Sequence, residues 1–121
     1  MKQSDSPFLT QLYATFRDQQ NYYILMELAE GGDVRSFLRN GSPRRQAFSQ
    51  LGEEAIKFIL GGVILALEEL HNNNIVYSDL KPENILIFQD GYPKLTDFGV
   101  SRQYSNKPCT FKNGTTQFFS P

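Results

Sequence analysis

Residues 77–88 read YSDLKPENILIF and concentrate polar groups between two apolar flanks. Asp79, Lys81, Glu83 and Asn84 fall within six consecutive positions. That density is unusual for a loop that only connects two strands, so we expect this loop to carry chemistry. The Asp79 carboxylate could orient a hydroxyl nucleophile and accept its proton. Lys81 could reach a phosphate with a compact positive charge, and Asn84 offers a carbonyl oxygen of the kind that magnesium accepts.

A second polar motif, Asp97-Phe98-Gly99, follows thirteen residues after Asn84. Asp97 would supply a second oxygen for magnesium, and Gly99 leaves the backbone free to swing that carboxylate. One amide and one carboxylate make a weak metal site on their own, because magnesium prefers to share its shell with water and substrate phosphates. A nucleotide is therefore implied. Phosphoryl transfer needs this combination of a hydroxyl-orienting carboxylate, a phosphate-binding cation and metal ligands.

Composition excludes several other classes of protein. The chain has 121 residues, of which 40% are hydrophobic and 21% charged, which is typical of one globular domain at most. The formal net charge of −1 gives no basic field for nucleic acid or an acidic membrane. The single cysteine, Cys109, cannot form an internal disulfide and fits a reducing compartment. No membrane span and no apolar signal core are found, so we expect a cytoplasmic protein.

The first third of the chain predicts a hairpin followed by a short helix. Leu12–Phe16 and Tyr22–Leu28 are aromatic-rich apolar runs separated by polar residues, a pattern typical of two antiparallel strands. Asp33 is a plausible cap for a helix that ends at Leu38. Asn40–Gln50 is polar, contains Gly and Pro, and is predicted to be a loop. Its Arg44-Arg45 pair could be a docking patch, although a solvated loop is the favoured interpretation.

The longest predicted helix is Glu53–Leu70, and His71 lies at its end. Gly61-Gly62 costs about 1 kcal/mol per glycine in a helix, which close packing against a neighbouring backbone would explain. A buried stripe is expected at the three-and-four spacing of Ile56, Ile59, Leu60, Val63, Leu67 and Leu70.

The last third of the chain predicts a second hairpin followed by irregular structure. Ile85–Phe88 and Lys94–Thr96 are predicted strands, joined by the turn Gln89-Asp90-Gly91. From Val100 onward the sequence is polar and is expected to be irregular.

The motif DLKPEN followed by DFG resembles the catalytic loop and metal-binding motif of eukaryotic protein kinases. Ser6–Phe16 and Tyr23–Asp33 are similar to the fourth strand, fifth strand and hinge of that family. Gly114–Pro121, GTTQFFSP, resembles the end of its activation segment. Tyr77, the LYATF run and the GGD run are similar to the AGC group, with cyclic-nucleotide-dependent kinases as the nearest relatives.

The resemblance implies an α+β fold, a partial form of the bilobal kinase architecture. Residues 1–28 would be small-lobe strands and residues 29–33 the hinge. Residues 34–121 would be the large lobe through the activation segment, truncated within the A-P-E region. By the same resemblance the protein is a Ser/Thr kinase that uses ATP and magnesium and acts on protein substrates.

Roles follow by matched position. Asp79, Lys81 and Asn84 resemble the catalytic residues, and Asn84 and Asp97 the metal ligands. Glu83 resembles a substrate-binding glutamate, Thr115 a threonine that bonds the catalytic aspartate and lysine, and Thr110 an activation-loop phosphosite. The positions similar to nucleotide-binding residues are Met26 (gatekeeper), Glu27 and Ala29 (hinge), Asp33 (ribose), Leu86 (adenine floor) and Thr96.

Besides the truncation within the A-P-E region, two departures from the family pattern matter. Ser78 stands where most kinases carry an arginine that pairs with a phosphate on the activation loop, and serine cannot supply that charge. Arg102 is a candidate to compensate in part. No glycine-rich loop or strand lysine precedes Ser6. We therefore expect the isolated chain to have little activity and to need other kinase-domain portions or a regulatory partner for stability.

Two alternative hypotheses stay open. The chain could be a pseudokinase module that binds partners without catalysis, or an incomplete gene-model fragment with no function of its own. The four intact groups Asp79, Lys81, Asn84 and Asp97 argue against the first alternative.

Overall fold

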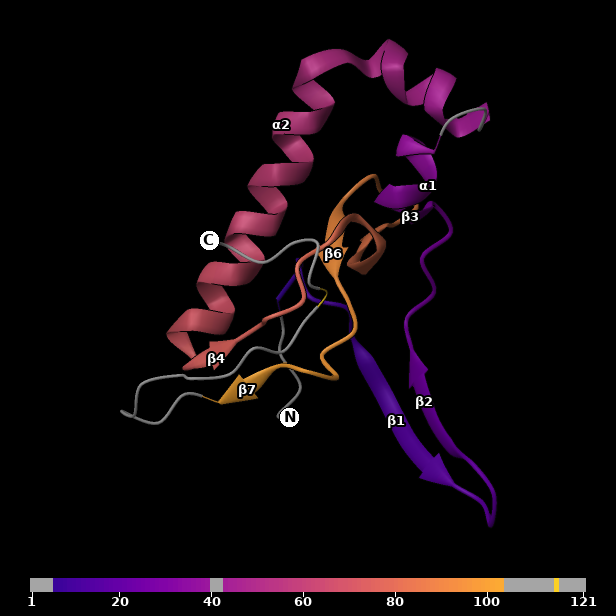
Figure 1. Cartoon of the computed structure of the whole chain (residues 1–121), viewed down its shortest axis with the longest axis vertical. Coiled ribbons are helices and arrows are strands. Elements are labelled where there is room, and N and C mark those ends of the chain that lie inside the picture. The colour runs from indigo at the N-terminus through magenta and orange to yellow at the C-terminus, as the bar shows by residue number, and fades with distance from the viewer. Residues whose placement is uncertain (1–5, 40–42, 104–114, 116–121) are drawn as a thin grey trace.

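The computed structural model describes residues 6–39, 43–103 and 115, without the side chains of residues 44, 45, 47, 48, 50 and 51. The described strands form three small antiparallel sheets, in the orders β1-β2, β3-β5-β6 and β4-β7. A long helix, α2, runs along one side of them (Figure 1). The elements are β1 (Leu12–Arg17), β2 (Tyr22–Met26), β3 (Gly32–Asp33), α1 (Val34–Leu38), α2 (Pro43–Asn72), β4 (Ile75–Val76), the 3-10 helix η1 (Pro82–Asn84), β5 (Ile85–Ile87), β6 (Pro93–Leu95) and β7 (Arg102–Gln103).

Strands β1 and β2 form the predicted hairpin, which projects away from the rest of the fold (Figure 1). Its turn is organised by Asp18, whose carboxylate accepts hydrogen bonds from the backbone N–H groups of Gln20 and Asn21, each at 2.7 Å. Phe16 and Tyr23 face one another across the strands with stacked rings 5.0 Å apart. The cross-strand aromatic pair and the turn together fix the register of the hairpin.

The predicted cap at Asp33 is confirmed. The Asp33 carboxylate accepts a hydrogen bond from the Ser36 backbone N–H at 2.8 Å, and α1 ends at Leu38 as expected. Before it, the chain passes so close to β5 that a Cβ on Gly31 would lie 2.5 Å from the Ile87 carbonyl oxygen. Only glycine fits this close approach, which lies one residue before β3 begins.

The loop predicted for Asn40–Gln50 is wrong, because α2 begins at Pro43. Proline is well tolerated in the first turn of a helix, where its missing N–H has no partner to lose. The break lies instead at Gly52, whose φ of 71° and ψ of −166° interrupt the helix and bend it (Figure 1). The remainder of α2 confirms the helix predicted from Glu53. The side chains of Arg44 and Arg45 lie outside the described structure.

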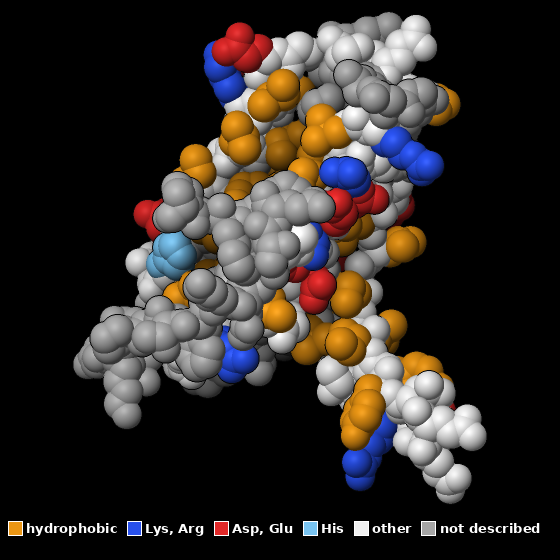
Figure 2. Space-filling model, in the orientation of Figure 1, with side chains coloured by type: hydrophobic (Ala, Val, Ile, Leu, Met, Phe, Trp, Pro, Cys, Tyr) orange, Lys and Arg blue, Asp and Glu red, His pale blue; other side chains and the backbone are white. Residues whose placement is uncertain are grey.

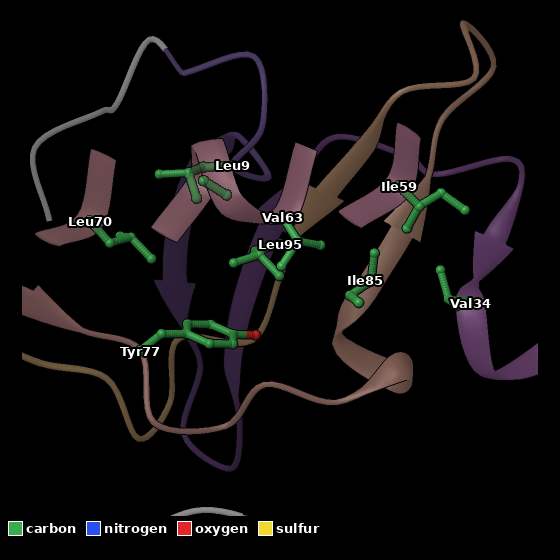
Figure 3. Packing of buried hydrophobic residues seen from close by; sticks show 9 residues of the cluster. Leu9, Val34, Ile59, Val63, Leu70, Tyr77, Ile85 and Leu95 are labelled. Atoms are coloured by element: carbon green, nitrogen blue, oxygen red, sulfur yellow. The ribbon is translucent and has the colours of Figure 1, made fainter. Parts of the chain in front are cut away.

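The core forms where the second half of α2 packs against β6 and β4 (Figure 3). The buried stripe of α2 has the predicted three-and-four spacing, but only some of the predicted residues belong to it. Ile56 and Leu60 are exposed, whereas Ala66, not predicted, has an exposed fraction of 0%. Ala66 lies on the same side of α2 as Ile59, Val63 and Leu70, which is the side that faces the core. The buried residues of this core are Leu9, Val34, Ile59, Val63, Ala66, Leu70, Tyr77, Ile85 and Leu95.

The second hairpin is confirmed, with β5 paired to β6 through Ile85 opposite Leu95. The turn closes through a hydrogen bond from Gly91 N–H to the Phe88 carbonyl at 2.9 Å, and Gly91 takes a φ of 84° that favours glycine. Leu95 is also bonded to the N-terminal segment, because its N–H donates to Phe8 and its carbonyl accepts from Thr10. The hairpin is thereby held at the centre of the core.

The region predicted to be irregular after Val100 contains one short strand. Arg102 pairs with Val76 and Gln103 with Ile75, which makes β7 the partner of β4. The sequence gives no periodic signal in so short a strand, so this pairing could not be predicted. Within the residues that the structure describes, no helix has the length and hydropathy that a membrane span requires.

The two adjacent glycines of α2 differ in their surroundings. A Cβ on Gly62 would lie 2.5 Å from Cγ of the Pro93 ring, whereas a Cβ on Gly61 would meet nothing within 4 Å. Of the two glycines, only Gly62 is closely packed as expected. It packs against the rigid side-chain ring of Pro93, whereas the sequence suggested packing against a neighbouring backbone.

We therefore expect opposite effects from Gly61→Ala and Gly62→Ala. Gly61→Ala should stabilise the fold by about 0.5–1 kcal/mol through helix propensity. Gly62→Ala should destabilise it by about 1–3 kcal/mol, because the added methyl overpacks the contact with Pro93. Urea unfolding of the longest natural chain that contains these residues measures both. Equal effects from the two variants would contradict the packing described.

Candidate active site

The Asp79 carboxylate lies at the centre of a dense hydrogen-bond network. Its Oδ1 accepts from the Thr115 backbone N–H at 2.8 Å and from Thr115 Oγ1 at 2.7 Å. Its Oδ2 accepts from Lys81 Nζ at 2.6 Å and from Asn84 Nδ2 at 3.0 Å. These four donors occupy all the acceptor positions that a carboxylate offers. The structure thus brings together Asp79, Lys81, Asn84 and Thr115, as the sequence predicts.

Charge and hydrogen bonding hold Asp79 in its ionised form. The Lys81 ammonium, followed by the Thr115 hydroxyl, lowers the pKa of Asp79 to about 2. The same ion pair raises the pKa of Lys81. Thr115 also accepts a hydrogen bond from Lys81 Nζ at 2.9 Å, so the three side chains form a closed ring. Asp79 is therefore a carboxylate at neutral pH, and its orientation is fixed.

The backbone on both sides of the site is strained. Ser78 has a φ of 68° and Asp97 a φ of 56°, in the left-handed region that residues with a Cβ rarely adopt. Such residues persist only where the surrounding contacts hold them. Here Tyr77 is buried, its hydroxyl donates to the Thr96 carbonyl, and its ring meets Phe98 edge-on at 5.6 Å. Burial raises the pKa of Tyr77, which keeps the phenol protonated as a donor.

The two candidate metal ligands meet at one end of the β5–β6 hairpin. Asn84 directly precedes β5, and its backbone carbonyl accepts from the Thr96 N–H at 3.0 Å, next to Asp97. Both amide hydrogens of Asn84 point to Asp79, since Nδ2 donates to the Asp79 carbonyl at 2.9 Å and to Oδ2. The side-chain carbonyl of Asn84 is thereby directed away from Asp79.

This donor set fits magnesium. It offers one amide oxygen and one exposed carboxylate, and magnesium completes such a set with water and phosphate oxygens. Asp97 Oδ1 also accepts from the Gly99 N–H at 3.3 Å, so one carboxylate oxygen is already oriented. Among the described residues, no cluster of three or more His, Cys, Asp or Glu side chains could hold a metal by itself.

Four of the residues predicted to bind the nucleotide lie in pairs. Asp33 stands opposite Leu86 where β3 pairs with β5. Thr96 Oγ1 lies 4.0 Å from the Met26 sulfur, although these residues are separated by 70 positions. The first pair connects β3 to β5, and the second connects the end of β2 to the residue after β6.

The two predicted hinge residues lie at the start of the connection between β2 and α1. The Ala29 carbonyl accepts from the Gly32 N–H at 3.2 Å. Glu27 is bound by Lys94 through an ion pair of 2.7 Å. Sequence reasoning missed Lys94. The only available signal was its place between the buried residues Pro93 and Leu95, which puts it on the opposite face of the strand.

The structure describes Glu83 and Arg102, two of the three residues predicted for substrate recognition and activation-segment control. Glu83 lies in η1 on the surface, and its carboxylate is 3.7 Å from the Arg35 Nε. Arg102, the candidate to compensate for Ser78, is exposed on β7 beside Val76. Thr110 lies outside the described residues.

Comparison with known proteins decides the family. The model of the protein kinase domain matches residues 1–121. The chain belongs to the protein kinase domain family. A cAMP-dependent protein kinase catalytic subunit of Schizosaccharomyces pombe is 41% identical over 95% of this chain. A cGMP-dependent protein kinase of Drosophila melanogaster is 42% identical over all of it, and a human cAMP-dependent protein kinase catalytic subunit 40% identical over all of it.

These relatives confirm the predicted AGC-like kinase resemblance and its α+β class of fold. The chain spans 21%, 15% and 32% of the lengths of these three kinases, so it corresponds to part of each.

The network around Asp79 predicts the effect of removing the Thr115 hydroxyl. Thr115→Val keeps the backbone donor but removes the side-chain donor, so the pKa of Asp79 should rise from about 2 toward its ordinary value. A carboxyl with a lowered folded pKa stabilises the fold above its unfolded pKa of about 4, and that stability is lost as pH falls through the folded pKa. The variant should therefore lose less stability than the wild type between about pH 4 and pH 2.

Carbon-13 NMR titration of the Asp79 carboxyl measures this shift directly. Thr15→Val is a matched control, because Thr15 is exposed on β1. An unchanged Asp79 titration in Thr115→Val would contradict the network.

Proposed function

We propose that this chain is part of a serine/threonine protein kinase of the AGC type, which transfers the γ-phosphate of ATP to protein hydroxyls with magnesium. The observation that carries the proposal is the placement of one ionised carboxylate, one lysine and two magnesium-type oxygen ligands around the catalytic loop. Phosphoryl transfer depends mainly on positioning and charge stabilisation, which this arrangement supplies.

In the proposed reaction, the oxygen of a serine or threonine hydroxyl bonds to the γ-phosphorus. The bond from that phosphorus to the bridging oxygen breaks, and ADP leaves. Asp79 orients the hydroxyl and takes its proton as the new bond forms. Because four donors already occupy the Asp79 carboxylate, one must leave before the hydroxyl can donate to it.

Lys81 is the donor best suited to leave. Its long side chain carries a mobile point charge, which would follow a γ-phosphate, whereas Asn84 and Thr115 hold Asp79 through short side chains or backbone. Movement of Lys81 from Asp79 to the phosphate would couple nucleotide binding to the opening of the hydroxyl position. Magnesium, held by Asn84 and Asp97, would neutralise charge on the phosphates.

Nucleotide and substrate contacts complete the proposal. Met26, Leu86 and Thr96 would contact adenine from the two hairpins, with the backbone of Glu27 and Ala29 at its edge and Asp33 at the ribose. Glu83 would face a basic group of the protein substrate, and Thr110 would be a phosphorylation site.

We also propose that further portions of a kinase domain, or a regulatory partner, cover two apolar surfaces of this chain. One is the β1–β2 hairpin, where Tyr22 and Ile24 are 83% and 64% exposed. The other is the side of α2 that carries Leu60 and Ile64, which are 53% and 64% exposed and lie one turn apart. Figure 2 shows hydrophobic side chains gathered in both places. Apolar surface of this extent is typical of sites that contact other protein.

Asp79→Asn tests the catalytic role. In the longest natural chain that contains these residues, we expect the variant to lose turnover by a factor of about 10³ or more, because the amide cannot accept the hydroxyl proton. ATP binding should be retained or tightened, since Asp79 does not contact the nucleotide and the variant no longer holds Lys81 away from the phosphate. A radiolabel-transfer assay and equilibrium dialysis measure the two quantities. Undiminished turnover would rule out Asp79 as the base, and an inactive wild type that binds partner proteins would favour the pseudokinase alternative.

A polypeptide of residues 1–121 alone is expected to be poorly stable. Its exposed apolar faces lack packing partners, and its catalytic groups lack the rigid surroundings on which preorganisation depends. Calorimetry should therefore show no cooperative unfolding transition, and phosphotransfer should be at background. A sharp transition together with measurable phosphotransfer would contradict this expectation.

A further inference from the structure

Among the ion pairs of the described residues outside Asp79–Lys81, the Glu27–Lys94 pair is the one that is largely buried. The two side chains are 14% and 16% exposed, and Lys94 Nζ lies 2.7 Å from Glu27 Oε2. By contrast, Lys57 is 59% exposed in its pair with Glu53 and Glu54. A pair removed from water resists screening by salt and holds its geometry more firmly than a surface pair.

Both oxygens of Glu27 have partners from distant parts of the chain. Oε1 accepts from the Gln11 backbone N–H at 2.6 Å, just before β1, and the Glu27 N–H donates to the Gln11 carbonyl at 3.1 Å. Oε2 accepts from Lys94 on β6, 67 positions away in the sequence. The Lys94 ammonium also lies 4.3 Å from the centre of the Phe88 ring, a cation–π contact. Glu27 therefore connects the first hairpin, the connection after it and the second hairpin.

Lys94 is close in sequence to groups that the proposed function uses. It precedes Thr96 by two positions and Asp97 by three, while Glu27 directly follows Met26. Next to Lys94, Leu95 is fully buried, so β6 is anchored in the core. The ion pair thereby attaches the segment that would meet adenine to the anchored strand that leads to the metal ligand.

We propose that Lys94 is a positioning residue for nucleotide binding, which acts through Glu27 to hold the adenine-contacting segment against the second hairpin. This inference rests on the proposed function. Lys94 itself need not touch the nucleotide. Removing its charge would leave the Glu27 carboxylate, 14% exposed, with the Gln11 N–H as its one remaining donor among the described residues. A largely buried carboxylate that has lost its counter-ion is costly, so the segment would move to hydrate it.

The test compares nucleotide affinities of variants of the longest natural chain that contains these residues. Lys94→Met should weaken the binding of adenosine and of magnesium-ATP by roughly tenfold each, because displacement of a binding segment by about 1 Å is that damaging. Binding of magnesium tripolyphosphate, which has no base, should stay unchanged. In steady-state assays the KM for ATP should rise while kcat changes by less than about twofold. This is the result expected when a mutation removes binding energy equally from the ground state and the transition state.

Two further variants separate positioning from general damage to the fold. Lys94→Arg keeps a cation for Glu27 and should retain most of the affinity. The double variant Lys94→Met with Glu27→Gln keeps an acceptor for Gln11 but removes the stranded charge, so it should bind adenosine more tightly than Lys94→Met alone. Lys57→Met is the matched control from an exposed ion pair and should leave all affinities unchanged. All measurements are made well below the unfolding temperature of each variant.

Each outcome decides one of the two claims. If the wild type binds adenosine and Lys94→Met binds it equally well, the positioning role is wrong while the proposed function stands. Equal losses for adenosine and tripolyphosphate, or no recovery in the double variant, would likewise overturn the positioning role. If the wild type binds no adenine nucleotide, the proposed function fails and the inference fails with it.

Discussion

The pairing of β5 with β6 is the contact on which the candidate site depends. Ile85 lies opposite Leu95, and both side chains are buried under α2. Leu95 is bonded on its other edge to the segment Phe8–Thr10, so the hairpin is held from two sides. Asn84 precedes one strand and Asp97 follows the other, which means that the same pairing sets the separation of both candidate metal ligands. Packing of Leu95 in the core therefore fixes the hairpin that positions Asn84 and Asp97.

The loop of residues 77–84 is held to this hairpin by polar contacts. Asn84 donates to both the backbone and the side chain of Asp79, and Tyr77 is bonded to Thr96 next to Asp97. The strained conformations of Ser78 and Asp97 are maintained by these contacts. Local strain that is held in this way is typical of functional sites, because it keeps reactive groups oriented before the substrate arrives.

Much of this arrangement could be predicted from sequence because its signals are local. The aromatic runs around Asp18, the cap at Asp33 and the turn at Gly91 each depend on a few neighbouring residues. The motif residues Asp79, Lys81 and Asn84 were found in the same way, since one short loop carries all three.

Other features depend on contacts between distant residues and could not be derived from local pattern. Composition suggested a loop for residues 40–50, but proline starts a helix as readily as it ends one. Gly61 and Gly62 look alike in sequence, and the positions of Pro93 and Phe8 distinguish them. The partner of Glu27 lies 67 positions away. Thr115 was assigned through resemblance to a family, because nothing nearby indicates that it would meet Asp79.

The most direct test of the account is a crystal structure of the longest natural chain that contains these residues, bound to magnesium and a non-hydrolysable ATP analogue. We expect a magnesium ion about 2.1 Å from the Asn84 side-chain oxygen and from the Asp97 carboxylate. We also expect that Lys81 Nζ has left Asp79 Oδ2 for a phosphate oxygen, while Thr115 and Asn84 still donate to Asp79. A nucleotide bound elsewhere, or a metal that touches neither ligand, would contradict the central claim that this loop is a phosphoryl-transfer site.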